Sequence, residues 1–390
     1  MSRYPHLASP VRVGPCELRN RVALLPHGLF FADPRELVPT DAHVAYYRER
    51  ARGGAGLVCT ESSVVSLDGR QGAPLVLSSD PRCIPGYRRI ADAVHAEGAR
   101  VAGQLTHYGN QAAAAVTKAP LLGPSALPDA ALREPARPLD TEGMARIRDD
   151  FVAGARNLAE AGFDLVELKV AHDGLLRQFL SPLTNDRADA YGGSFENRVR
   201  YPLEVARAVR AEVGGAVALG VRLVLDECLP GGYDLDGGIA MAELLVASGL
   251  FDYVNADVGI WASVHMVVPP MSIPEGYGEG AFARAASALD VPVIAFGRIQ
   301  TPDYAEQVLA EGKAAVVGMA RQLIADPHWA RKALTGDGSS IRPCTYCNQL
   351  CVGNGMKLLP VSCTVNPLVG DGETRPVPPT TGRRVVVVGG

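Results

Sequence analysis

Four cysteines near the C-terminal end form the pattern with the most specific chemistry in this chain. Cys344, Cys347, Cys351 and Cys363 follow the spacing C-x2-C-x3-C-x11-C. Thiolates bind both zinc and iron–sulfur clusters, and structural zinc usually shows two C-x2-C pairs or histidine partners. Three cysteines on one short turn, with a fourth returning from a distance, favour a [4Fe–4S] cluster, and zinc stays the alternative.

A disulfide framework is not expected, because the chain has the features of a cytoplasmic protein. Residues 1–15 contain no apolar run behind a basic start, and no run of 18 apolar residues predicts a membrane helix. Clustered cysteines in such a chain bind metal more often than they cross-link. Cys16, Cys59, Cys83 and Cys228 lie in apolar segments and are interpreted as small buried hydrophobic residues.

Composition and charge fit an enzyme that acts on a small molecule. The chain has 390 residues and a formal net charge of −4, with acidic and basic residues interspersed. No basic stripe with interleaved aromatic residues is present, so nucleic acid is not an expected partner, and neither is a membrane. Assembly of several copies stays open. The length predicts one large domain with an appendage.

Short apolar runs alternate with longer amphipathic stretches along the chain. The expected strands are 21–25, 56–60, 100–105, 163–170, 216–223, 251–257, 291–296 and 314–317, and the expected helices include 87–97, 144–161, 198–213, 239–247 and 302–311. Eight continuous hydrophobic strands, each followed by a helix, predict an α/β fold, the closed parallel (β/α)8 or TIM barrel. A doubly wound open sheet would need a glycine fingerprint after an early strand, and none precedes the C-terminus.

Polar residues and glycines cluster at the carboxyl ends of the expected strands, where such barrels carry out chemistry. Gly297 and Gly318 leave backbone N–H groups open to an anion, and Arg298 and Arg321 add positive charge. Gln104 and Arg222 can hydrogen-bond a polar ring system. Each residue alone also fits a purely structural role, but together they predict a phosphorylated planar cofactor. The full set is Pro26, His27, Gly28, Thr60, Glu61, Gln104, Lys169, His172, Arg222, Asp257, Gly297, Arg298, Gly318, Ala320 and Arg321.

Three longer motifs resemble those of the old yellow enzyme superfamily of NADH:flavin oxidoreductases. They are Gln178–Arg198, which contains Tyr-Gly-Gly-Ser at 191–194, together with Asn20–Val22 and Gly103–Gly109. The cysteine block narrows the resemblance to the branch of 2,4-dienoyl-CoA reductase and trimethylamine dehydrogenase. It implies FMN at the barrel mouth and a [4Fe–4S] cluster nearby. The implied FMN contacts are Pro26, His27, Gly28, Thr60, Gln104, Arg222, Gly297, Arg298, Gly318, Ala320 and Arg321.

The same resemblance implies three parts of the chain. These are an FMN-binding barrel over 1–338, a cluster segment over 339–370, and over 371–390 a linker with the start of an FAD- and NAD(P)-binding domain. Residues 384–390, Arg-Val-Val-Val-Val-Gly-Gly, resemble the first strand of that domain cut at its glycine loop. We therefore expect a truncated chain, with FAD and NAD(P)H as cofactors of the full-length protein.

Departures from the family pattern concern the flavin and the substrate. Gly28 stands where trimethylamine dehydrogenase has the cysteine that bonds to its flavin, so a non-covalent flavin is expected. Lys169 and His172 occupy the positions of the family's substrate-binding pair. Gly174 stands where many ene-reductases have a proton-donating tyrosine.

The resemblance and these residues predict reduction of an activated C=C bond by hydride from FMN N5. Lys169 and His172 would then polarise a substrate carbonyl oxygen. Asp257, Trp261 and His265, after the sixth strand, are candidate proton donors, and the predicted catalytic set is Lys169, His172, Asp257 and His265. Two alternatives stay open. One is an amine dehydrogenase or N-demethylase, in which a neutral His172 orients the amine. The other is an electron-transfer barrel without turnover.

Overall fold

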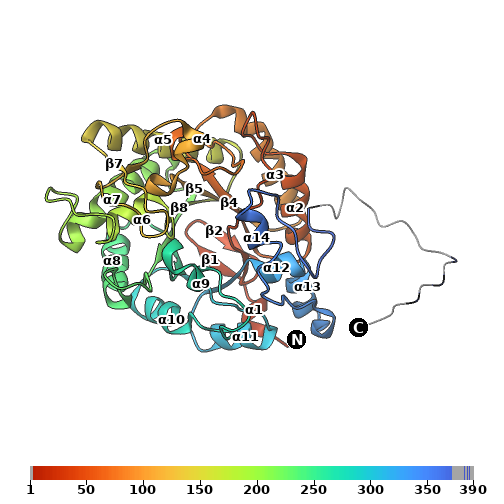
Figure 1. Cartoon of the computed structure of the whole chain (residues 1–390). Helices are drawn as coiled ribbons and strands as arrows, with labels where there is room; N and C mark the ends of the chain where they lie inside the picture. Colours follow the sequence, from red (N-terminus) through yellow and green to blue (C-terminus); the bar gives the residue numbers. More distant parts are fainter. Residues whose placement is uncertain (1–2, 371–381, 383, 385, 387–390) are drawn as a thin grey trace.

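Eight parallel strands close into a barrel, as the alternation of apolar runs and amphipathic stretches predicts (Figure 1). The computed structural model describes residues 3–370 together with 382, 384 and 386. The barrel strands are β3 (Val22–Leu24), β4 (Leu57–Val64), β5 (Arg100–Thr106), β8 (Leu165–Val170), β9 (Ala218–Val224), β10 (Tyr253–Asp257), β11 (Val293–Ala295) and β12 (Val316–Met319). Each overlaps one of the predicted runs. The predicted TIM barrel is therefore confirmed.

The helices form the outer layer, with one or more following each strand (Figure 1). They are α2 (Asp41–Arg52), α3 (Ile84–Ala96), α5 (Thr141–Glu160), α7 (Phe195–Val213), α8 (Leu235–Ala247), α10 (Glu279–Ala288), α11 (Pro302–Ala310), α12 (Arg321–Ala325) and α13 (Trp329–Leu334). Four of them begin after a residue whose side chain accepts a hydrogen bond from the third helical N–H; these residues are Asp140, Ser194, Asp234 and Thr301.

Helix α2 was not among the helices named from the sequence, because its buried face is polar and aromatic. His43, Tyr46, Tyr47 and Arg50 are buried on this face. Arg50 lies over the Tyr46 ring, with 3.4 Å between its guanidinium carbon and the ring centroid. A helix that buries such side chains does not show the apolar periodicity that a sequence search uses.

A hairpin of β1 (Val11–Val13) and β2 (Cys16–Leu18) precedes the barrel and covers its amino end. The Cys16 thiol lies 3.5 Å from the carbonyl of Asp164, just before β8. Arg100, the first residue of β5, donates to the carbonyl of Glu17 at 3.3 Å. With that end covered, the loops at the carboxyl end are the ones free to build a site.

Residues 339–370 return across the carboxyl end of the barrel, where α14 (Val352–Gly355) lies over its mouth (Figure 1). The Val361 N–H donates to the carbonyl of Leu29 at 3.0 Å, and the Asn366 amide to that of Ile324 at 2.9 Å. The predicted strand at 384–390 lies outside the described residues, apart from the single positions Arg384 and Val386.

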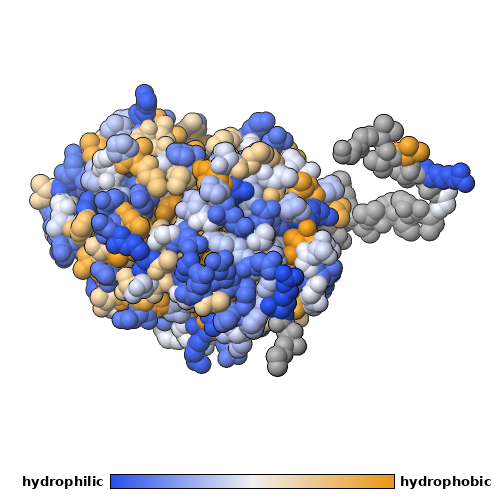
Figure 2. Space-filling view, turned by 90° about the horizontal axis from the view of Figure 1, so that it is seen from below, coloured by the Kyte–Doolittle hydropathy of each residue, from blue (hydrophilic) through white to orange (hydrophobic). Residues whose placement is uncertain are grey.

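The surface seen from below mixes hydrophilic residues with scattered hydrophobic ones (Figure 2). In the part of the chain that the structure describes, no helix is both long and apolar enough to cross a bilayer.

Candidate active site

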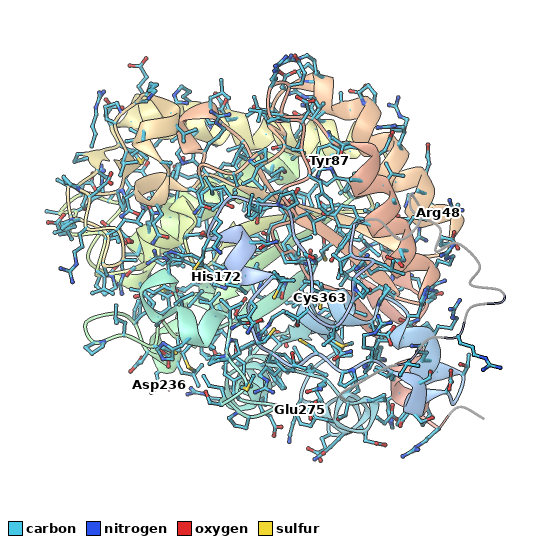
Figure 3. All side chains as sticks on the ribbon, turned by 45° about the vertical axis from the view of Figure 1, so that its right-hand side comes forward. Arg48, Tyr87, His172, Asp236, Glu275 and Cys363 are labelled. Carbon is cyan, nitrogen blue, oxygen red and sulfur yellow. The ribbon has the colours of Figure 1, made fainter. Side chains whose placement is uncertain are left out.

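A cavity of about 330 Å³ opens at the carboxyl end of the barrel. Most of the residues selected from the sequence line it, although they come from seven different strand ends. They are Pro26, His27, Gly28, Gln104, Lys169, His172, Arg222, Asp257, Gly297, Arg298, Gly318, Ala320 and Arg321. Figure 3 shows His172 near the centre of the molecule, whereas Arg48 and Asp236 lie toward its edge.

Three of the residues selected from the sequence, Thr60, Glu61 and His265, do not line this cavity. The Glu61 carboxylate instead accepts from the N–H groups of Leu29 and Phe30 at 2.6 and 3.1 Å. The Thr60 hydroxyl is buried between strands and donates to the carbonyl of Ala102 at 3.3 Å. An irregularity in the β4–β5 pairing between Cys59 and Ser62 changes the register, and Ser62 lines the cavity. His265 lies on α9 (Val264–Val267) and is exposed.

A buried ion pair joins neighbouring strand ends in the cavity wall. Arg222 donates to Asp257 Oδ2 from Nε at 2.9 Å and from a terminal nitrogen at 2.5 Å. Arg222 also reaches across the barrel to the carbonyl of Pro26 at 3.3 Å. Burial opposes the charged form of Asp257, but Arg222 and His172 outweigh it and lower the pKa of this carboxyl. Asp257 is therefore ionised throughout the neutral range.

His172 stands at the end of β8 beside this carboxylate. Its Nε2 is 3.0 Å from Asp257 Oδ2, yet the two atoms are not aligned as a hydrogen bond, so the contact is electrostatic. Its φ of 47° is rarely adopted by residues other than glycine. Burial lowers the pKa of His172 despite the neighbouring Asp257. The imidazole is thus neutral at pH 7.

Lys169 supplies a cation on the same wall. Its Nζ is 2.5 Å from Asp173 Oδ1 and 4.9 Å from the centroid of the Tyr108 ring. Asp173 also accepts a hydrogen bond from the Gln71 amide at 3.1 Å. The ammonium is held over the cavity by a carboxylate on one side and an aromatic face on the other.

A polar chain crosses the barrel beneath the cavity. Gln104 accepts from the Ser62 hydroxyl and donates to Glu167 Oε1 at 2.6 Å. Glu167 is fully buried, and its second oxygen accepts from Asn255 at 3.0 Å. Burial raises the pKa of Glu167. The Gln104 amide is therefore fixed in one orientation as it faces the cavity.

His27 has both ring nitrogens engaged. Nδ1 is 2.7 Å from the carbonyl of Leu25, which can only accept, and Nε2 is 2.7 Å from the hydroxyl of Tyr46. Nδ1 therefore carries the proton, and Nε2 accepts from Tyr46. Burial lowers the pKa of His27 to about 4, so its ring is neutral at pH 7.

The ends of β11 and β12 form a cationic cradle. Arg298 donates to the carbonyls of Pro270 and Met271 at 3.2 and 3.1 Å, while its buried Nε has no hydrogen-bond partner among the described residues. Gly297 has a φ of 106°, a conformation that favours glycine. Arg298 and Arg321 lie 3.9 and 4.7 Å from the Tyr346 ring centroid. A buried N–H donor without a partner, on one of two arginines that share an aromatic ring, suits an anion.

All four clustered cysteines, Cys344, Cys347, Cys351 and Cys363, line a second, smaller cavity, and none forms a disulfide. The two cavities are adjacent, since Arg321, Ile324, Tyr346 and Cys351 line both. In Figure 3 Cys363 and His172 both lie in the central part of the molecule.

Several cavity residues had not been selected from the sequence: Ser62, Tyr108, Asp173, Tyr277 and Tyr346. Two of them carried a signal: Tyr108 lies within the Gly103–Gly109 motif, and Asp173 lies four residues after Lys169, with which it forms an ion pair. The tyrosines come from loops whose course depends on tertiary packing.

A model of the NADH:flavin oxidoreductase / NADH oxidase family matches residues 6–337. The chain belongs to this family. It is a flavin-dependent oxidoreductase of the old yellow enzyme superfamily, which confirms the resemblance found in the sequence.

The relatives include reductases as well as dehydrogenases. The chain is 38% identical over 98% of its length to a metal reductase of Desulforamulus reducens, covering 57% of that protein. It is 36% identical over 99% of its length to an N,N-dimethylglycine/sarcosine dehydrogenase of Chromohalobacter salexigens, again covering 57%. A solved 2-naphthoyl-CoA reductase complex superposes with a TM-score of 0.91 at 28% identity, covering 94% of this chain and 58% of that one. The chain thus spans less than two thirds of these relatives.

The cavity fits the FMN of this family. Arg298 Nε is a buried donor without a partner, which suits the phosphate, and Arg321 adds charge beside it. Gln104 and Arg222 present fixed donors to the polar edge of a ring. Gly28, which has no side chain, lines the cavity beside His27.

Arg298→Gln should weaken FMN binding by about tenfold or more, because a charge-assisted hydrogen bond to the phosphate contributes about 1.5–3 kcal/mol. Riboflavin, which lacks the phosphate, should bind the variant and the wild type alike in a fluorescence titration. Arg284→Gln, which removes an exposed ion pair with Asp236, is the control. Equal losses for FMN and riboflavin would contradict the phosphate assignment.

The pKa of His27 predicts a pH dependence of stability. Between pH 6.5 and about 4 the unfolded chain protonates His27 and the folded chain does not, so the free energy of unfolding falls as the pH falls. His27→Gln should make this fall shallower in urea titrations of the flavin-free protein.

His95 provides the opposite case as a control. Its hydrogen bond to Asp164 raises the pKa of His95, so its contribution to stability is present at low pH and lost as the pH rises. His95→Gln should therefore make the fall toward pH 4 steeper. Identical slopes for both variants and the wild type would refute the assignment.

Proposed function

We propose that this chain is the FMN- and [4Fe–4S]-binding part of an oxidoreductase that reduces an activated C=C bond, such as an enone or an enoyl thioester. The observation that carries the proposal is the ammonium of Lys169 in the cavity wall, which the neutral His172, three residues later in the sequence, also lines. When bound, FMN supplies hydride transfer. What the protein must add is substrate orientation and stabilisation of negative charge.

Lys169 suits a substrate carbonyl oxygen. Its three N–H donors are shared only with Asp173 in the described cavity wall, so the ammonium keeps a donor for the substrate. As the double bond accepts a hydride, negative charge develops on the carbonyl oxygen, and a cation nearby stabilises it. The low-dielectric cavity strengthens this interaction.

The second candidate is oxidation of a methylated amine. The carboxylates of Asp173 and Asp257, with the aromatic rings of Tyr108, Trp261 and Tyr277, suit a cationic substrate. The N,N-dimethylglycine/sarcosine dehydrogenase relative acts on such amines by its name. Lys169 argues against this candidate, because an ammonium substrate would meet a like charge.

The four cysteines support a cluster rather than a single zinc ion. Zinc bonded at about 2.3 Å would hold its sulfurs about 3.8 Å apart. Within the described ranges no three His, Cys, Asp or Glu side chains are arranged to hold one metal ion, although all four thiols face one cavity. Three cysteines on one short turn with a fourth from a distance is the spacing that suits a cubane cluster. We propose NAD(P)H as the electron source, with FAD and the cluster passing the electrons to FMN.

The reaction is tested on the dithionite-reduced enzyme under anaerobic conditions. An enone should reoxidise the flavin, and Lys169→Met should slow this step by about 100-fold, because a stabilising donor is lost. Lys169→Arg should retain part of the rate. Since the single variant leaves Asp173 buried without its partner, Lys169→Met/Asp173→Asn controls for that charge.

The opposite result identifies the second candidate. If a methylated amine bleaches the oxidised flavin of the wild type, and Lys169→Met accelerates the bleaching, the enzyme is an amine dehydrogenase. If neither an enone nor an amine changes the flavin spectrum, the chain is an electron-transfer barrel.

The metal assignment is tested by analysis of anaerobically purified protein. We expect about four iron and four sulfide per chain. Cys351→Ala should lower both values and remove the broad visible absorbance of the cluster, while Cys228→Ala should leave them unchanged because Cys228 lies away from the cysteine cavity. One zinc per chain with no iron would refute the cluster.

A further inference from the structure

Reduction of a C=C bond to a CH–CH unit consumes one hydride and one proton. The inference below rests on the proposed function, in which the reduced flavin is the two-electron donor and supplies the hydride. The proton must come from a protein group or from water. We therefore compare the groups in the described cavity wall that hold a transferable proton.

The acidic and imidazole side chains of the cavity wall are not suitable proton donors at pH 7. Burial disfavours the ionised forms of Asp173 and Asp257. Lys169 nevertheless lowers the pKa of Asp173, and Arg222 lowers the pKa of Asp257, so neither carboxyl holds a proton at pH 7. Burial keeps His172 neutral. His265, selected earlier as a candidate donor, lies outside the cavity.

Two of the three tyrosines that line the cavity have contacts away from Lys169. The Tyr277 hydroxyl donates to the carbonyl of Met266 at 2.6 Å. Tyr346 is flanked by Arg298 and Arg321 at the cationic cradle, on the side shared with the cysteine cavity. Neither ring is in contact with Lys169 among the described residues, whereas the ring of Tyr108 is.

Tyr108 remains, and it is next to Lys169. Its ring centroid is 4.9 Å from Lys169 Nζ, and the residue is 5% exposed. Its backbone is held at both ends, because its N–H donates to Gly69 at 3.0 Å and its carbonyl accepts from the Gln178 side chain at 2.9 Å. Burial raises the pKa of Tyr108 well above its ordinary value, so the phenol keeps its proton at neutral pH.

The phenol lies near Ser62, whose hydroxyl donates to the Gln104 side-chain oxygen. Gln104 donates in turn to Glu167 at 2.6 Å. The side chains next to the phenol are thus fixed from the barrel core.

We propose that Tyr108 donates the proton to the substrate α-carbon. The hydride forms the new C–H bond at the β-carbon, and the C=C electron pair moves toward the carbonyl held by Lys169. That pair then takes the Tyr108 proton, which breaks the O–H bond, forms the α C–H bond and leaves a phenolate. Water reprotonates the phenolate. The flavin is oxidised by two electrons and the alkene is reduced by two.

The test compares two ring substrates on the dithionite-reduced holoenzyme, 2-cyclohexenone and 1-nitrocyclohexene. A nitro group stores the electron pair as a stable nitronate, so hydride transfer to the nitroalkene does not need the enzyme's proton. Tyr108→Phe should slow reoxidation by the enone by about 100-fold or more. The nitroalkene should still reoxidise the flavin at a near wild-type rate, and its nitronate should accumulate in the ultraviolet spectrum.

Two further measurements separate chemistry from structure. The dissociation constant of cyclohexanone, which cannot react, should change less than threefold in Tyr108→Phe. Tyr304 lies outside the cavity, and its hydroxyl donates a hydrogen bond to Glu279. Tyr304→Phe should therefore behave as the wild type with both substrates.

Other outcomes overturn the proposal in distinct ways. Wild-type enone rates in Tyr108→Phe would assign the proton to water. Equal losses with both substrates would make Tyr108 a residue that positions the substrate for hydride transfer. If neither substrate reoxidises the wild-type flavin, the proposed function itself fails, independently of Tyr108.

Discussion

The arrangement of the cavity depends on the buried ion pair between Arg222 and Asp257. Two charges removed from water are stable only when each satisfies the other, so the pair holds the ends of β9 and β10 in one geometry. Arg222 extends this constraint across the barrel to the carbonyl of Pro26. The same carboxylate faces His172. The Asp257 carboxylate is therefore in contact both with Arg222, a predicted flavin contact, and with His172, a predicted substrate contact.

The longest of the three family motifs does not lie in the cavity. None of the residues in Gln178–Arg198 lines it. Instead, Ser194 caps α7, and a side chain on Gly192 would collide with the backbone of Arg187. Asn185 donates to the carbonyls of Phe179 and Tyr191 at 2.6 and 2.8 Å. The motif builds a tightly bonded loop that starts a helix, and this explains why it marks the fold without indicating the substrate.

The cysteine segment is part of the site rather than an appendage beside it. Asn348 accepts from Arg321 at 2.8 Å and donates to the carbonyl of Val268 at 2.9 Å. Gln322 accepts from the N–H of Cys344 at 2.9 Å. These contacts place Tyr346 against the two arginines of the anion cradle. Loss of the segment would therefore alter the cavity as well as the cysteines, because one wall of the cavity comes from it.

The sequence by itself determined the barrel, the family, and most of the residues at the cavity. Strands buried on both faces must be continuously apolar, and their carboxyl ends must meet at one end of the barrel, so His172, Arg222 and Arg298 followed from position alone. Only the tertiary structure decided that Ser62 replaces Thr60 in the cavity and that Tyr108 stands beside Lys169. A register irregularity and the course of a loop depend on contacts between segments far apart in the chain, which local periodicity does not encode.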